Sequence, residues 1–299
     1  MRDGDILNYA IVVLNYNNYK LTQSSVDKLL NYIDDNLVVI VDNNSSNESY
    51  SVLNDHFTDY KNVEVIRNSE NKGYAAGNNF GMLYIKDKRP DIEYYVIMNP
   101  DVEIDDKTLM DSLMFHLEND RSIACISPLM LFNKVLDLQN CFWSIPDNIS
   151  IYSNWLTLDV KRKEKNKLIY NHSKVSYVDV VPGSFFMIRK KFFEEIGQLD
   201  ENTFLYNEEI ILAWMVREHG YKNAVVIDKY YHHNHQKGER KSLKVKLNGL
   251  KMANSSRRYL CSKYYNKKCG FMLNIVCVIN VIKCIIKHVG GNIINLIKK

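Results

Sequence analysis

The chain has 299 residues, of which 46% are apolar, so it can bury a sizeable core in one large domain with an appendage or in two small domains. This composition argues against intrinsic disorder, and a formal net charge of only +4 argues against a dedicated nucleic-acid-binding protein. The charge is uneven, because residues 237–299 are rich in Lys and Arg and contain almost no acidic residues. Such a basic end suits anionic lipid or a phosphate-bearing partner.

Six cysteines are scattered along the chain, and none of them forms a Cys-x-x-Cys pair. This spacing argues against a zinc site, and scattered thiols are typical of a reducing cytosol. The first residues are polar and acidic, and we find no signal-peptide pattern in them. We therefore expect a cytoplasmic protein.

The first hundred residues predict strands that alternate with helices. Strands are expected at residues 9–14, 37–41, 63–67 and 94–98, and helices at residues 20–33, 49–57 and 78–86. This order predicts parallel βαβ units, and therefore an α/β fold with a doubly wound, mostly parallel sheet.

Polar clusters follow three of these predicted strands, at residues 15–18, 42–47 and 99–101. In doubly wound sheets the ligand binds beyond the carboxyl ends of the strands. Any one cluster is explained about as well by turn formation. Three clusters at the same edge predict a ligand crevice.

The second half of the chain shows a weaker pattern. Strand character returns at residues 178–190, and a helix is expected at residues 208–219, ended by Gly220. Residues 271–299 form an apolar run that contains Lys283 and Lys287. Each lysine would cost about 2.5–3.5 kcal/mol at the centre of a bilayer, so an amphipathic helix on the membrane surface is favoured over a spanning helix. A helix packed on the protein itself or in a dimer is the alternative.

Two features suggest a site for a phosphate-bearing ligand. Asp101, at the end of a predicted strand, suits a divalent cation that neutralises a diphosphate, although Asn-Pro-Asp is also a common turn. Residues 71–81 are rich in small side chains, which let a ligand approach the backbone where a helix begins. Their spacing matches neither Gly-x-Gly-x-x-Gly nor a P-loop.

Acidic and imidazole groups complete the candidate site. Glu208 and Glu209 begin a predicted helix, where a carboxylate can serve as a general base or simply interact with the helix dipole. His232, His233 and His235 are expected in a loop opposite Asp101, where a neutral imidazole could bind a metal or a diphosphate. A solvated histidine cluster is the plainer interpretation.

Taken together, these segments resemble the family-two glycosyltransferases of the GT-A fold, especially the rhamnosyltransferase-like branch. The resemblance covers about residues 9–265, and it is carried by residues 13–17, 41–45, 71–78, 99–102, 182–186 and 204–209. It implies a GT-A-like domain at residues 1–262. Residues 263–299 are expected to form a basic and apolar helical tail that contacts the membrane surface. Removal of residues 270–299 is expected to release the protein from anionic vesicles and to spare activity on a short soluble acceptor.

The resemblance implies a role for each matching residue. It implies that a nucleotide sugar contacts Asn15, Tyr16, Asp42, Asn71, Gly73, Asn78 and Asn99. It implies Asp101 as the ligand of Mg²⁺ or Mn²⁺, with His233 as a later metal or diphosphate contact and His232 and His235 as rivals. Glu209 resembles the catalytic base, and Glu208 an acceptor-binding residue.

Three positions depart from the family pattern. Ile211 and Met215 stand where members often carry an acid and an arginine, and the base is Glu where Asp is usual. The implied function is an inverting transfer of a sugar, with rhamnose as one candidate, from a nucleoside-diphosphate donor to a glycan or lipid-linked acceptor in polysaccharide synthesis at the inner face of the cell membrane. A catalytically impaired scaffold and a nucleotidyltransferase are the alternatives, and the latter lacks its basic, Gly-rich loop at residues 15–19.

Overall fold

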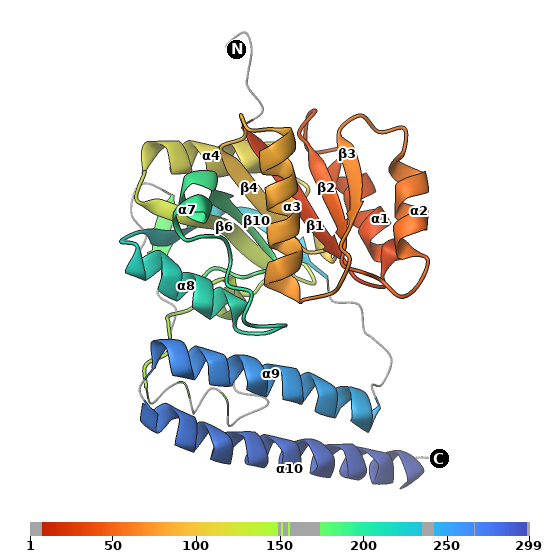
Figure 1. Cartoon of the computed structure of the whole chain (residues 1–299), viewed down its shortest axis with the longest axis vertical. Helices are drawn as coiled ribbons and strands as arrows, with labels where there is room; N and C mark the ends of the chain where they lie inside the picture. The colour runs from red at the N-terminus through yellow and green to blue at the C-terminus, as the bar shows by residue number, and fades with distance from the viewer. Residues whose placement is uncertain are drawn as a thin grey trace.

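The structure is a computed structural model that describes residues 8–148, 151, 155, 174–234, 242–265 and 267–297, without the side chains of residues 267–269 and 291–297. Its centre is a single sheet with helices on both faces (Figure 1). The strand order is β3-β2-β1-β4-β9-β6-β10-β5, with β7 paired to β6 and β8 paired to β10.

The N-terminal half of the sheet is parallel. It contains β1 (Tyr9–Asn15), β2 (Val38–Asp42), β3 (Val63–Arg67) and β4 (Tyr94–Met98), connected by α1 (Tyr19–Leu29), α2 (Ser49–Phe57) and α3 (Tyr74–Lys88). β1, β2 and β4 are nearly continuous buried apolar runs, as is typical of parallel strands covered on both faces, whereas the edge strand β3 is only partly buried. The predicted strands are confirmed. The first helix ends four residues earlier than expected, and α3 begins four residues earlier.

The other half of the sheet is mixed. Here β9 (Phe185–Arg189) lies antiparallel between β4 and β6 (Ile123–Phe132), and β10 (Lys222–His233) runs parallel to β6. The remaining elements of this half are β5 (Val102–Glu103), α4 (Leu109–Asn119), β7 (Val135–Leu136), α5 (Leu138–Cys141), β8 (Val175–Val178), α7 (Lys190–Glu195) and α8 (Glu208–Glu218). The fold is therefore α/β with a doubly wound N-terminal half, as expected.

The histidine cluster does not lie in a loop. His232 and His233 are the last two residues of β10, and they pair with Glu103 and Val102 of β5 in antiparallel register. The expectation of a loop was wrong because residues 222–233 form one long strand with a register shift between Val226 and Tyr230. His235 lies outside the described residues.

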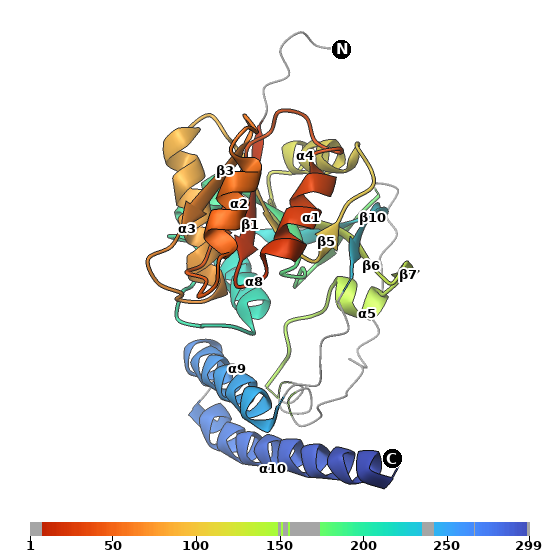
Figure 2. The ribbon, with the colours of Figure 1, turned by 90° about the vertical axis from the view of Figure 1, so that its right-hand side faces the viewer.

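The last two helices, α9 (Leu243–Tyr264) and α10 (Lys267–Ile297), form a pair that we call the α9–α10 hairpin. Figures 1 and 2 show the two helices side by side, beyond the end of the sheet that lies near the start of α8. Polar anchors support this docking: Ser256 Oγ donates to the Leu205 carbonyl at 2.7 Å, and Asn280 Nδ2 donates to the Trp155 carbonyl at 2.7 Å.

An apolar cluster joins the hairpin to α8. Its members are Ile151, Trp155, Ile210, Ile211, Met215, Leu260, Cys261, Leu273, Val276 and Cys277. The boundary expected between residues 262 and 263 falls in the last turn of α9. Because α9 packs along α10, we propose that the appended unit contains both helices.

The opposite face of α10 is apolar and exposed. Phe271, Ile275, Val278, Ile282 and Ile286 recur at intervals of three and four residues, and between 44% and 73% of each residue's surface is exposed. By length and composition, the segment from Gly270 to Gly290 could also span a membrane. The predicted helix is thus confirmed, with its apolar face directed away from the protein.

Not all cysteines are free thiols, contrary to the expectation from their scatter. Cys125, Cys141, Cys277 and Cys284 are free and buried, whereas Cys261 is disulfide-bonded. Sequence spacing gave no indication of this bond.

Candidate active site

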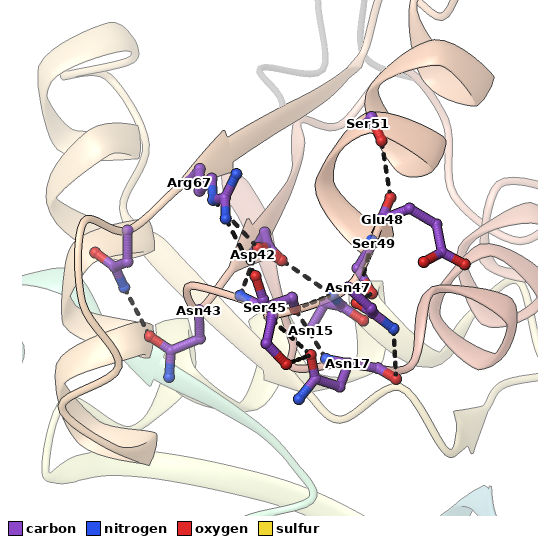
Figure 3. A network of polar contacts seen from close by, with 12 residues as sticks. Asn15, Asn17, Asp42, Asn43, Ser45, Asn47, Glu48, Ser49, Ser51 and Arg67 are labelled. Atoms are coloured by element: carbon purple, nitrogen blue, oxygen red, sulfur yellow. Dashed lines mark hydrogen bonds and ion pairs between the residues drawn. The ribbon is translucent and has the colours of Figure 1, made fainter.

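A polar network closes the carboxyl ends of β1 and β2 (Figure 3). Asp42 is completely buried, and its Oδ1 accepts a hydrogen bond from the Ser45 backbone N–H at 3.0 Å. Asn15 Nδ2 contacts Asp42 Oδ2 at 3.4 Å and Ser45 Oγ at 3.3 Å, while Arg67 Nε lies 3.9 Å from Asp42 Oδ1. The carboxylate therefore organises this edge of the sheet. Its expected contact with a nucleotide stays a prediction.

Neighbouring residues differ in their exposure. Asn15 is fully buried, and its Oδ1 accepts a hydrogen bond from Thr22 Oγ1 at 2.8 Å. Tyr16 follows it directly and is 52% exposed. Of these two predicted nucleotide contacts, the structure leaves the Tyr16 side chain open to a ligand.

The small-residue segment before α3 binds another part of the chain. The Tyr74 backbone N–H donates to the Phe204 carbonyl at 3.0 Å, and a Cβ added at Gly73 would lie 2.1 Å from the same oxygen. Gly73 also has a φ of +105°, which L side chains rarely adopt. The close approach expected of a ligand is thus made by the protein's own backbone, because the loop that leads to α8 docks here.

Two asparagines expected at the nucleotide have structural contacts. Asn71 Oδ1 accepts hydrogen bonds from Asn43 Nδ2 at 3.0 Å and from the Gly73 N–H at 2.9 Å, which shapes the loop. Asn78 is completely buried in α3, and its Nδ2 donates to the Tyr74 carbonyl at 3.0 Å. Neither these residues nor Gly73 line the main cavity described below.

Asp101 and His233 meet at the end of β10. Asp101 Oδ2 lies 3.2 Å from His233 Nε2, and the Asn234 N–H donates to the Asp101 carbonyl at 3.1 Å. The other ring nitrogen of His233 lies 3.3 Å from Met130 Sδ. His232 instead contacts Asp105 Oδ2 at 2.9 Å, so His233 is the one of these two described histidines that faces Asp101.

One carboxylate and one imidazole are a suitable start for a divalent cation site. Mg²⁺ and Mn²⁺ accept few protein ligands and complete their shell with phosphate oxygens and water. Among the described residues, no group of three or more His, Cys, Asp or Glu side chains is placed to hold a metal ion. The pair fits a cation that a diphosphate would help to bind.

The two glutamates begin α8 from a strained turn. Tyr206 and Asn207 both have positive φ values, 78° and 68°, and such conformations in residues other than glycine concentrate at functional sites. This turn places Glu208 and Glu209 at the N-terminus of the helix. Glu209 packs on Gly183, where an added Cβ would lie 3.3 Å from Oε1.

Burial changes the acidity of the first of these two carboxyl groups. Burial, and then the neighbouring charge of Glu209, raise the pKa of Glu208 to about 8. Its Oε1 is buried and makes no hydrogen bond to any described residue. Glu208 is therefore largely protonated at neutral pH, which leaves Glu209 as the better candidate for a proton acceptor.

A cavity of about 1160 Å³ joins these groups. Of the residues expected at the site, Asn99, Glu208, Glu209 and His233 line it. Asn99 is placed by its N–H, which donates to the Ser184 carbonyl at 2.8 Å. The cavity therefore combines the predicted catalytic residues with the end of β10.

Several residues of this cavity were not predicted. Tyr74 lines it, and its hydroxyl donates to the Gly183 carbonyl. Ser184 Oγ and the buried Tyr231 hydroxyl lie 2.8 Å apart. The Pro-Gly-Ser tripeptide and the tyrosine next to the histidines were the available signals. The hairpin residues Arg257, Cys284 and Lys287 also line the cavity, and no local pattern pointed to them.

The fold defines the class of this protein. A sheet whose parallel half ends in a polar edge, beside a cavity with two carboxyl groups, is a GT-A-like arrangement. The chain belongs to glycosyl transferase family 2, whose model matches residues 10–197.

A relative from Haloferax volcanii, the low-salt glycan biosynthesis hexosyltransferase Agl10, is 27% identical over 208 residues, which are 70% of this chain and 61% of the relative. The chain thus spans about three fifths of that relative's length.

Two solved structures share the fold. GalNAc-T7 with UDP, GalNAc and Mn²⁺ has a TM-score of 0.60 at 16% identity, covering 92% of this chain and 55% of the other. The mannosyltransferase PcManGT from Pyrobaculum calidifontis, with GDP-Man and Mn²⁺, has a TM-score of 0.56 at 11% identity, covering 91% and 69%.

Proposed function

We propose that the protein is an inverting, metal-dependent glycosyltransferase that moves a sugar from a nucleoside-diphosphate donor to a glycan or lipid-linked acceptor. The observation that carries the proposal is the single cavity in which Glu208, Glu209, Asn99 and His233 meet. Family membership and a hexosyltransferase relative support it. Rhamnose, the sugar suggested by the sequence, is one candidate among hexoses.

Glu209 acts as the general base in this proposal. The acceptor hydroxyl oxygen attacks the anomeric carbon of the donor, the bond from that carbon to the diphosphate oxygen breaks, and Glu209 takes the hydroxyl proton. A positioned base of this kind contributes about 10²–10⁴-fold to the rate. Glu208, protonated at neutral pH, can donate a hydrogen bond to the acceptor.

Asp101 and His233 are the residues that would hold the cation. When bound, Mg²⁺ or Mn²⁺ neutralises the charge that develops on the leaving diphosphate. The proposal agrees with the Mn²⁺ in both structures of similar fold. Tyr16, at the edge of the sheet beside Asn15, is the exposed side chain on which the nucleotide base can lie.

The scaffold alternative rested on two apolar residues of α8. Ile211 and Met215 are buried in the cluster that joins α8 to the hairpin. Their apolar character therefore has a packing explanation and is no sign of a lost active site. The nucleotidyltransferase alternative has no specific observation in its favour.

Membrane attachment is the second part of the proposal. The exposed apolar face of α10 supports a peripheral position at the inner face of the cell membrane. The basic end of the chain was expected to contact anionic lipid, but Lys287, one of the two lysines within its apolar run, lines the cavity. We propose that apolar side chains provide most of the attachment.

The direct test is transfer with purified protein. A panel of nucleoside-diphosphate sugars is incubated with Mn²⁺ and a glycosyl acceptor, and the anomeric configuration of the product is read by NMR. Donor hydrolysis without acceptor separates an active enzyme from a scaffold. If the protein shows neither donor hydrolysis nor sugar transfer with any donor, the proposal is excluded.

A further inference from the structure

The hairpin forms one wall of the active-site cavity. On α9, the cavity is lined by Lys246, Gly249, Leu250, Ala253 and Arg257. Lys246, Gly249 or Leu250, Ala253 and Arg257 recur at intervals of three and four residues, so they lie on one side of the helix. The wall therefore carries two basic side chains separated by small and apolar residues.

The side chain of Arg257 contacts an amide and an aromatic ring. Its Nη1 donates to Asn254 Oδ1 at 3.0 Å, and its guanidinium lies 5.4 Å from the centre of the Trp155 ring. In the part of the chain that the structure describes, no carboxylate forms an ion pair with it, and burial lowers its pKa. A guanidinium has five N–H donors, and one contact to an amide leaves most of them for a ligand.

The cavity is large enough for two substrates. Its volume of about 1160 Å³ exceeds the roughly 300–1,000 Å³ of most small-ligand pockets. Glu208 and Glu209, the residues proposed for chemistry, line the same cavity. Trp155, whose ring lies 5.4 Å from the Arg257 guanidinium, and Leu250 also line the cavity, and both suit an apolar group.

We propose that Arg257, assisted by Lys246, binds the phosphate that links the acceptor sugar to its lipid. Guanidinium matches phosphate through paired hydrogen bonds, and the adjacent apolar lining accommodates the first part of the lipid. This inference rests on the proposed glycosyltransferase function. It adds the chemical class of the acceptor, a lipid phosphate, and places it on the hairpin side of the cavity.

Steady-state kinetics test the assignment with two matched acceptors. One carries the sugar on a short-chain lipid diphosphate, and the other carries it on an uncharged alkyl group. Arg257→Gln is expected to raise KM for the phosphorylated acceptor by about 10- to 100-fold, the usual worth of hydrogen bonds to charged groups. KM for the donor and turnover on the uncharged acceptor are expected to stay within about twofold of wild type.

Arg258→Gln is the matched control, because Arg258 is the next residue, is exposed and does not line the cavity. It should behave as wild type. An equal effect of Arg257→Gln and Arg258→Gln would overturn the proposal. A rise in KM for the donor instead of the acceptor would assign Arg257 to the donor diphosphate and would also overturn it.

A binding measurement keeps the two proposals distinguishable. Calorimetry with a ten-carbon isoprenyl diphosphate and with inorganic diphosphate needs no turnover and separates lipid-linked phosphate from free phosphate. Wild type should bind the isoprenyl compound more tightly, and Lys246→Gln should weaken it about 3- to 10-fold even if Arg257→Gln fails to fold. Absence of binding by the wild type refutes the subsite, whereas absence of sugar transfer with binding intact refutes only the proposed function.

Discussion

The polar edge of the sheet and the hairpin wall of the cavity differ in how their polar groups are satisfied. At the ends of β1 and β2, Asn15, Asp42 and Ser45 bond to one another and are buried. On the hairpin side, Arg257 has an amide partner and no described carboxylate partner. The first region holds its own shape, whereas we propose that the second receives an anion. A motif rich in polar residues is thus no guide by itself to where a ligand binds.

Asp101 faces His233 at the end of β10, and its removal should have the largest effect. We expect Asp101→Ala to abolish transfer and metal-dependent donor binding, because the cation loses its carboxylate ligand. Asp105→Ala, which removes the contact to His232, is the matched control. Transfer assays and a thermal-shift titration with Mn²⁺ measure the effect. Full activity of Asp101→Ala would remove the metal role.

The glutamate pair is tested by neutral substitutions of each partner. Glu209→Gln should lower turnover about 10²–10⁴-fold with donor affinity nearly unchanged, since a general base acts only in the transition state. Glu208→Gln should lower turnover less, because Gln preserves a hydrogen-bond donor. Turnover and KM for the donor are measured for both variants. If the effects are reversed, Glu208 is the base.

The loop before α3 packs against the protein's own backbone, so a methyl group at Gly73 is expected to destabilise the fold. Gly73→Ala should destabilise the fold by at least about 2 kcal/mol, because the left-handed φ is strained and Cβ would meet the Phe204 carbonyl. Urea unfolding gives the free energy. Gly197→Ala is the control, since Gly197 also has a positive φ of 68° but nothing lies within 4 Å of an added Cβ. Equal losses in the two variants would contradict the close contact.

The outer face of the hairpin is tested by surface changes. Truncation is unsuitable because α10 buries Leu273 and Val276 against the cluster on α8 and α9. The double variant Ile282→Asn/Ile286→Asn should reduce co-sedimentation with anionic vesicles about tenfold or more, since each buried Ile contributes about 1.5–3 kcal/mol. Ile282→Val/Ile286→Val is the control. Wild-type protein that stays in the supernatant would disprove the membrane proposal.

The smallest predicted effect is on how the free energy of unfolding changes with pH. The folded-state pKa of Glu208, about 8, lies above the ordinary value of 4.5, so the folded state binds more protons than the unfolded state between these values. Glu208 therefore makes the wild type progressively less stable as pH rises from about 4.5 to about 8. Glu208→Gln should remove this loss and gain about 1 kcal/mol or more at pH 8 relative to pH 5. Urea unfolding at both pH values measures it, and an equal gain at both would show that Glu208 is not buried as an acid.

Local patterns in the sequence determined the parallel half of the sheet. The β-branched runs, the interposed helical periodicity and the position of Glu208 and Glu209 at a helix start are short-range features, and each was predictable. The sequence also placed Asp101 at a strand end and the apolar repeat in α10. These results depend on residues within one or two turns of one another.

Only the tertiary structure decided how distant segments meet. Gly73 was read as room for a ligand, but Phe204, 131 positions later, fills that room. His233 faces Asp101 because β10 pairs with β5, and Arg257 enters the cavity because the α9–α10 hairpin folds across α8. Such contacts arise from packing of whole elements, in which burial of Ile211 and Met215 outweighs any polar role at those positions.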